Sequence, residues 1–228
     1  MKIVSKINVT FLFFLATSSI SSAEDVRLHP LETFSVKYSH EGMMSGESKQ
    51  QCRNWCNEMV NTINQTMSMM GITQNTNQKT ITIRDKIYNI DLDKGTVTEA
   101  TNPMYDTMVQ ASQNNGADPM AFAQQWMDAL GYQATGNSRT ILGESCQDYT
   151  SPQLMGSTVC MTEDGLTLRM AMDMGQRMSS VQTAIEIKRN DPGEDVDYEI
   201  PAGAQPAAPA PDLQQIQDML ENLQNMNQ

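Results

Sequence analysis

Short runs of alternating apolar and polar residues occupy most of the chain outside its middle. In the stretch TFSVKYS, Phe34, Val36 and Tyr38 alternate with polar residues, which is the two-residue period of a half-buried β-strand. Residues 79–96 hold two such runs around a polar break at 84–86, and this arrangement predicts a β-hairpin. Further strands are predicted at 139–150, 157–174 and 181–189. The pattern therefore favours a chain built mainly of β-strands.

The stretch LRMAMDMGQRM, residues 168–178, has a methionine at every second position of its first half. Successive side chains of a strand point to opposite faces, so a strand separates these methionines from the charged residues between them, whereas a helix would scatter them. The apolar face of this predicted strand holds Leu168, Met170, Met172 and Met174. Met67 and Met69 show the same two-residue spacing on another predicted strand.

The next apolar run has the opposite parity. Val181, Thr183, Ile185 and Ile187 stand at odd positions, so a turn or bulge is required near 179–180. A hairpin there would let the two apolar faces coincide, and we expect that arrangement.

The middle of the chain has helical signals instead. Residues 104–113 form a first helical stretch after Asn102-Pro103. Asp118 is a good N-cap for a second helix, with Pro119 at the first helical position and Gly131 placed to end it. Its apolar stripe includes Phe122, Trp126 and Leu130. Strands, helices and then strands again predict an α+β fold, in which helices lie against one face of an antiparallel sheet.

The two ends of the chain differ from this domain. Residues 1–23 combine two lysines, an apolar core and a small-residue ending, the layout of a cleaved secretory signal peptide. The apolar core is too short to span a bilayer comfortably, and Glu24 follows instead of a lipid-anchor cysteine. We expect a periplasmic or secreted protein that does not span the membrane, with its domain at 24–203.

A Pro/Ala linker at 204–211 is expected to be extended and fairly stiff. Residues 212–228 then form a short amphipathic helix, which alone is marginally stable in water. This segment is either a fraying tail or a helix that docks on a protein partner or in the protein's own groove.

Charge and motifs exclude several functions. Removing the signal peptide changes the formal net charge from −12 to −14, which argues against nucleic acid and anionic membranes as partners. The sequence contains no nucleophile elbow, phosphate loop, zinc-protease motif or dinucleotide fingerprint. We therefore expect a protein that is not an enzyme, with no catalytic residue and no cofactor.

The four cysteines are expected to form two disulfides, because an exported chain meets an oxidising compartment. Four cysteines allow three pairings. Local pairing of Cys146 with Cys160 closes a loop of about 15 residues, and Cys52 pairs with Cys56 if a tight turn separates them. We favour these two local bridges over the other pairings.

The 19 methionines leave three interpretations open. They fill an ordinary core, they line an adaptable cavity for acyl chains or another apolar ligand, or their thioethers bind Cu(I). For the copper alternative, further ligands come from His29, His40, Met43 and Met44, although the sequence holds only two histidines and no compact metal cluster.

Several phrases together resemble a known family: FSVKYSHEGMMSG, IYNIDLDKGTVTEATNPM, ILGESCQDY, DGLTLRMAMDMG and YEIPAG. In this order they are similar to uncharacterised exported proteins grouped with the LolA-like carriers, over roughly residues 33–203. The resemblance implies a curved antiparallel half-barrel whose apolar concave face is capped by helices, here 104–131. LolA and LolB move lipoproteins through the periplasm by sheltering acyl chains in that cavity. Cys52, Cys56, the C-terminal helix and the methionine-rich faces depart from the family pattern, and no active-site residue is carried over.

The sequence thus predicts a periplasmic carrier that shelters a lipid or lipoprotein acyl chain in a methionine-lined cavity. The alternatives are a copper-binding envelope protein and a structural or assembly factor that acts through residues 212–228. The predicted cavity lining comprises Met67, Met69, Leu168, Met170, Met172 and Met174, closed by Phe122, Trp126 and Leu130.

Overall fold

The structure is a computed structural model that describes residues 26–69, 72–103, 105–114, 118–154, 156–173, 179–203 and 205–206. The predicted signal peptide, the helix at 212–228 and Met174 lie outside the described residues, as does most of the predicted linker. Within the described part of the chain, no helix is long and apolar enough to cross a membrane.

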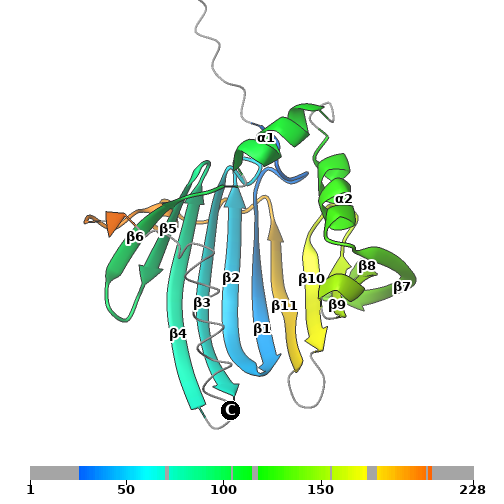
Figure 1. The fold of residues 1–228 in the computed structure, drawn as a ribbon, viewed down its shortest axis with the longest axis horizontal. Helices are drawn as coiled ribbons and strands as arrows, with labels where there is room; N and C mark the ends of the chain where they lie inside the picture. The colour runs from blue at the N-terminus through cyan, green and yellow to red at the C-terminus, as the bar shows by residue number, and fades with distance from the viewer. Residues whose placement is uncertain are drawn as a thin grey trace, which may run out of the picture.

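The fold is one open, curved sheet in which each strand pairs antiparallel with its neighbours, except for a short parallel strand at one edge (Figure 1). The strand order is β12-β6-β5-β4-β3-β2-β1-β11-β10-β9-β8-β7. The first six strands are β1 (Phe34–Gly42), β2 (Met44–Arg53), β3 (Glu58–Met69), β4 (Ile72–Ile83), β5 (Lys86–Asp91) and β6 (Thr96–Thr101). The others are β7 (Gln133–Ile141), β8 (Glu144–Ser151), β9 (Ser157–Met161), β10 (Thr167–Asp173), β11 (Ser179–Arg189) and β12 (Gln205–Pro206). The predicted hairpin around 84–86 is present as β4 and β5.

Two helices separate β6 from β7, as the sequence predicts. They are α1 (Tyr105–Asn114) and α2 (Pro119–Ala129), and they lie toward one end of the sheet (Figure 1). The carboxylate of Asp118 accepts a 2.9 Å hydrogen bond from the backbone N–H of Met120, which confirms the N-cap. Gly131 ends the helix with a φ of 72°, a conformation that suits glycine.

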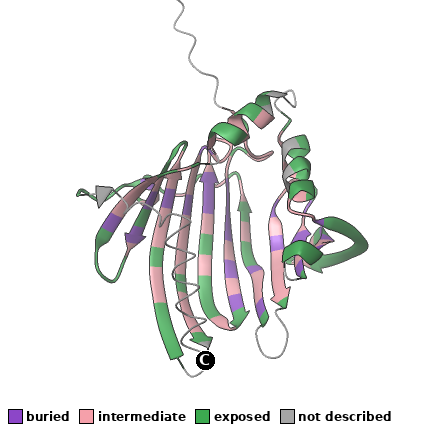
Figure 2. Cartoon of the chain, viewed as in Figure 1, coloured by how far each residue is buried: buried purple, intermediate pink, exposed green. Residues whose placement is uncertain are grey.

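Two clusters of buried side chains lie on different faces of the sheet. The first surrounds β1 and includes the Cys146–Cys160 disulfide; its buried members are Phe34, Val36, Tyr38, Cys52, Cys146, Cys160, Leu166, Leu168 and Ala184. The second lies on the other face of β3 to β6; its members are Val60, Ile81, Tyr88, Ile90, Val97 and Tyr198. Tyr198 belongs to the 3-10 helix η2 (Asp195–Tyr198), so the C-terminal part of the domain covers this second face. In β2, β3 and β4 the buried positions lie in the half near α1 (Figure 2).

The strand prediction for the methionine stretch is confirmed as far as Asp173, but the expected coincidence of apolar faces is wrong. Met170 pairs with Gln182 and Met172 with Ser180, so Val181 and Thr183 lie on the opposite face. The register between β1 and β11 shifts between Lys37 and Tyr38. This bulge brings Ile187 opposite Val36, against the first cluster, and leaves Ile185 40% exposed.

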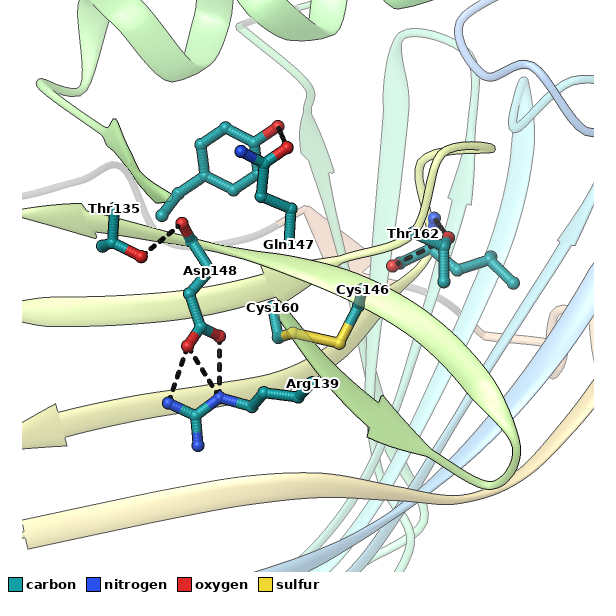
Figure 3. The surroundings of a disulfide bond; sticks show 9 residues. Thr135, Arg139, Cys146, Gln147, Asp148, Cys160 and Thr162 are labelled. Atoms are coloured by element: carbon teal, nitrogen blue, oxygen red, sulfur yellow. Dashed lines mark hydrogen bonds and ion pairs between the residues drawn. A yellow bond between two sulfur atoms is a disulfide. The ribbon is translucent and has the colours of Figure 1, made fainter. Parts of the chain in front are cut away.

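Both predicted disulfides are present. Cys146 and Cys160 join β8 to β9 with a Cα–Cα distance of 5.4 Å, and Cys52 and Cys56 have a Cα–Cα distance of 4.9 Å. Beside the first of these bonds, the buried carboxylate of Asp148 accepts hydrogen bonds of 2.8 Å from the guanidinium of Arg139 on β7 (Figure 3). A cross-link and an ion pair therefore fix this part of the sheet.

The strand β7 ends the strand order and pairs with β8. Its register shifts between Ala134 and Ser138, and Gly136 has a φ of 79° within that shift. All of its residues except Ile141 are exposed. Among the described residues no strand pairs with its outer side.

Candidate functional site

The stretch CRNWC folds as a tight left-handed turn between β2 and β3. Asn54, Trp55 and Cys56 have φ values of 55°, 51° and 64°, a region that side-chain-bearing residues rarely occupy in succession. The Cys52–Cys56 bond closes the turn. The connection between β2 and β3 is therefore a compact, cross-linked turn at one end of the sheet.

This turn anchors the segment that precedes β1. The backbone N–H of Leu28 donates to the carbonyl of Trp55 at 3.2 Å, and the N–H of Trp55 donates to the carbonyl of Glu32 at 3.0 Å. The guanidinium of Arg27 lies 5.0 Å from the centre of the Trp55 ring. The chain that enters the domain is thus held against the turn by backbone and ring contacts.

Asn57 connects the same turn to three other parts of the protein. Its side chain is almost completely buried, and its amide donates to the carbonyls of Val26 at 2.7 Å and Asn54 at 2.8 Å. Its side-chain carbonyl accepts a 3.3 Å hydrogen bond from the hydroxyl of Tyr105 at the start of α1. Its backbone carbonyl accepts from the N–H of Arg84 in the β4–β5 turn at 2.7 Å. A buried amide with this many partners fixes the position of α1 relative to the sheet.

A cavity of about 270 Å³ lies between these elements. Its floor consists of side chains from β1 to β4, and its other walls come from the segment before β1, the start of α1 and the β9–β10 loop. Its apolar and aromatic lining residues are Leu28, Phe34, Tyr38, Met59, Tyr105, Met108 and Leu166. Polar side chains of His29, Gln50, Thr82, Arg84 and Asn102 also line it. We name the face of the sheet that forms its floor the cavity face.

Two polar side chains at the cavity, those of His29 and Tyr38, form hydrogen bonds with the backbone of its walls. The Nδ1 of His29 accepts a 3.1 Å hydrogen bond from the backbone N–H of Leu31, and its ring packs 4.7 Å from the ring of Phe34. Burial lowers the pKa of His29, so the neutral ring is favoured. The hydroxyl of Tyr38 donates to the carbonyl of Thr167 at 3.0 Å, and burial raises the pKa of this tyrosine. The lining therefore combines apolar and aromatic surface with a neutral histidine ring and one charged guanidinium, that of Arg84.

Away from this cavity the cavity face is uncharged and polar over much of β2 to β4. Cross-strand partners share a face, so the register places Gln50, Asn61 and Thr80 in one row and Ser48, Ile63 and Gln78 in the next. Methionines lie farther from α1: Met44 pairs with Met67, and Met170 and Met172 lie on β10.

None of the residues predicted to line a cavity is among those that line this one. Leu168 is fully buried in the first cluster. Met67, Met170 and Met172 are half-buried on the cavity face, and Leu130 is half-buried after α2. The structure places Phe122, Trp126 and Met69 in their predicted helix and strand but does not describe their side chains.

Sequence reasoning missed the residues that do line the cavity, because they come from segments spread over the chain from residue 28 to residue 167. One signal was available. A disulfide between residues only four apart requires a compact turn, so Cys56 in that turn and Met59 just after it must lie close to the segments that pack against the turn. The contribution of the residues before β1 had no such signal.

The two histidines do not form one site. The cavity contains His29, whereas His40 lies near the other end of β1, six residues beyond Phe34 and so about 20 Å away along the strand. Among the described residues, no three His, Cys, Asp or Glu side chains lie together in a way that could hold a metal ion.

Comparisons with known proteins concern the fold. No family model matches the chain, and no curated protein matches it. An uncharacterised conserved protein from Thermus thermophilus has a similar structure, with a TM-score of 0.50, 9% identity, and coverage of 78% of this chain and 91% of that one. PNGF-II matches with a TM-score of 0.39 and 11% identity over 83% of this chain, which spans about a third (32%) of PNGF-II. LprF from Mycobacterium bovis matches with a TM-score of 0.33 and 9% identity, over 75% of this chain and 94% of LprF.

Only the first of these similarities is high enough to support a shared architecture. At 9% identity it concerns the fold alone. What the comparisons establish is that this chain shares an open antiparallel sheet with the Thermus thermophilus protein, which is itself uncharacterised.

Proposed function

We propose that the chain is an exported binding or carrier protein of the LolA-like type, which shelters an apolar group such as a lipid or lipoprotein acyl chain. The binding site is the cavity between α1 and the cavity face. The observation that carries the proposal is the cavity itself, because its walls combine aliphatic, thioether and aromatic surface with a smaller number of polar side chains. Pockets of this kind are the usual form of small-molecule sites.

The size of the cavity limits what it holds. At about 270 Å³ it is slightly smaller than the range of roughly 300–1,000 Å³ for small-molecule pockets. One acyl chain end fits this space better than a whole lipid. A larger cargo would require α1 to move, and α1 is the element that serves as a lid in this proposal.

Location is part of the same proposal. Both disulfides are bonds that persist in oxidising compartments, which supports a periplasmic or secreted protein. The signal peptide predicted at 1–23 gives the route of export. A docking role for residues 212–228 is a separate expectation, tested by whether their deletion abolishes the capture of a partner while the domain stays folded.

The test combines extraction and uptake. Protein purified from its native compartment is extracted with organic solvent, and the extract is analysed by mass spectrometry for a co-purifying lipid. The purified protein is then titrated with a fluorescent fatty acid. We expect a stoichiometric lipid or saturable uptake, and the failure of both would refute the proposal.

A cavity-filling variant locates the site. Met108 on α1 lines the cavity, so Met108→Trp should fill it and weaken fatty-acid uptake at least tenfold. Met120→Trp is the matched control, since Met120 lies on α2, is 37% exposed and is not among the residues that line this cavity. Equal uptake by the two variants would show that the ligand binds elsewhere.

A further inference from the structure

His40 has an unusual environment for a buried histidine. It is 8% exposed, in the half of β1 that lies away from the cavity. Its Nε2 lies 2.7 Å from the hydroxyl oxygen of Ser48 on β2. Its Nδ1 is buried and has no hydrogen-bond partner. A buried polar atom without a partner is costly and calls for an explanation, such as a ligand that binds there.

The direction of this nitrogen follows from the bond made by the other one. The two ring nitrogens of imidazole point in diverging directions. Ser48 pairs with Tyr38, so Nε2 points toward β2 and toward the Tyr38 end of β1. Nδ1 is therefore directed the other way, across β11 toward β10.

Two methionines of β10 share the face of His40 on the side toward which Nδ1 is directed. His40 pairs with Gln182, and Gln182 pairs with Met170, which places Met170 in the same cross-strand row two strands away, about 9.6 Å at the usual strand spacing. Gly42 pairs with Ser180, and Ser180 pairs with Met172, so Met172 lies one row farther along.

A third methionine lies on the opposite side of His40, away from Nδ1. Met44 lies on β2, two residues from Gly46, the β2 partner of His40. Gly42 and Gly46 have no side chains, so these two positions contribute no side chain beside His40. Toward Met170, the residue in the same row is Gln182, whose flexible side chain would have to lie aside for an ion to bind.

We propose that His40 Nδ1 and the thioethers of Met170 and Met172 form a binding site for a soft monovalent metal ion, Cu(I). The proposal rests on this cluster alone and does not depend on a ligand in the cavity beneath α1.

The donor set matches Cu(I) in chemistry. Thioether and imidazole ligands suit Cu(I), whereas Ca²⁺ and Mg²⁺ require oxygen ligands. All the ligands are neutral, which suits a monovalent ion better than a divalent one. With Nδ1 bound to the metal, Nε2 carries the proton and its N–H donates a hydrogen bond to the hydroxyl oxygen of Ser48. A hydrogen bond from the second ring nitrogen orients most histidine ligands in this way.

The experiment uses the exported full chain and two probes, Cu(I) under reducing conditions and Ag(I) as a soft ion without redox chemistry. Competition with a chromogenic chelator gives affinity and stoichiometry. We expect one ion per chain, and a loss of affinity of at least tenfold in the double variant Met170→Leu/Met172→Leu. Leucine keeps the apolar volume at both positions, so this variant should fold. A melting curve like that of the parent checks this.

The matched control is Met59→Leu/Met108→Leu, which removes two thioethers from the cavity beneath α1 and should leave the affinity unchanged. Ser48→Ala should weaken binding by about tenfold, because it removes the group that orients the ring. In spectra of ¹⁵N-histidine-labelled protein, one equivalent of Ag(I) should shift the Nδ1 resonance of His40 and leave His29 unaffected. The proposal is overturned if binding survives in the Met170/Met172 variant, if the control loses affinity equally, or if the Nδ1 resonance does not move.

Discussion

Removing the Cys52–Cys56 bond should loosen one end of the protein without unfolding it. The perturbation is Cys52→Ala/Cys56→Ala, compared with Cys146→Ala/Cys160→Ala. Each variant loses two sulfurs and one cross-link, so the comparison isolates what each loop contributes. The CRNWC turn holds the segment before β1 and the start of α1, whereas Cys146–Cys160 joins two strands of the sheet.

The two magnitudes follow from loop length. The chain-entropy model gives about 3 kcal/mol for the loop closed by Cys146 and Cys160, with a separation of 14 residues, and about 2 kcal/mol for the separation of 4 between Cys52 and Cys56. Left-handed backbone costs roughly 1–2 kcal/mol per ordinary residue, and Asn54, Trp55 and Cys56 all adopt it. Once the cross-link is removed, the turn relaxes and recovers part of that cost. The free energy of unfolding should therefore fall by less than about 2 kcal/mol in the first variant and by about 3 kcal/mol in the second.

Denaturant unfolding measures both values, and hydrogen exchange locates the change. In the Cys52/Cys56 variant the amides of Leu28, Trp55 and Asn57 should lose protection, while those of β10 and β11 keep it. Because the same turn positions α1, fatty-acid uptake should also weaken. The reasoning is refuted if this variant is destabilised more than the Cys146/Cys160 variant, or if its exchange rises evenly over the whole sheet.

Three further changes test other parts of the structure. Leu142→Asn should raise the free energy of unfolding by about 0.5–1 kcal/mol in urea denaturation, because Leu142 is 53% exposed with a φ of 53° next to Gly143, and Asn-Gly suits this turn; a decrease would contradict it. Leu168→Ala should lower the free energy of unfolding by about 2–5 kcal/mol because the side chain is fully buried, whereas Met170→Leu should lower it by less than about 1.5 kcal/mol. Similar losses of stability in the two variants would contradict the placement of Leu168 in the core. Burial holds the pKa of His29 below its ordinary value of 6.5, so the stability that depends on the neutral ring is complete above about pH 6.5 and is lost as the pH falls below it. His29→Asn should be less stable at neutral pH but should lose less on acidification, and parallel pH–stability curves for the two proteins would contradict this.

Features set by local residues could be predicted from the sequence. Asp118 and Pro119 specify the start of α2 through one side-chain bond and one fixed dihedral angle. The alternation around Met170 and Met172 specifies a strand because no other conformation separates its apolar and charged residues. The cysteine pairs also follow from chain separation together with turn residues.

Features set by contacts between distant segments could not be predicted. The bulge at Lys37 and Tyr38 decides which face Ile187 joins, and it depends on how β1 and β11 twist together. The cover provided by Tyr198 and the wall provided by Leu28 come from irregular segments that have no period to detect. For the same reason the cavity could be expected from the resemblance, but its lining could not.

An open sheet has edge strands to which a second molecule can add a strand of its own and so begin a fibre. On β7 the shift between Ala134 and Ser138, with a glycine inside it, interrupts the regular row of hydrogen-bonding groups that such an addition needs. Such a break makes this edge a poor template for a strand from another molecule, so the sheet can stay open without offering a regular edge there.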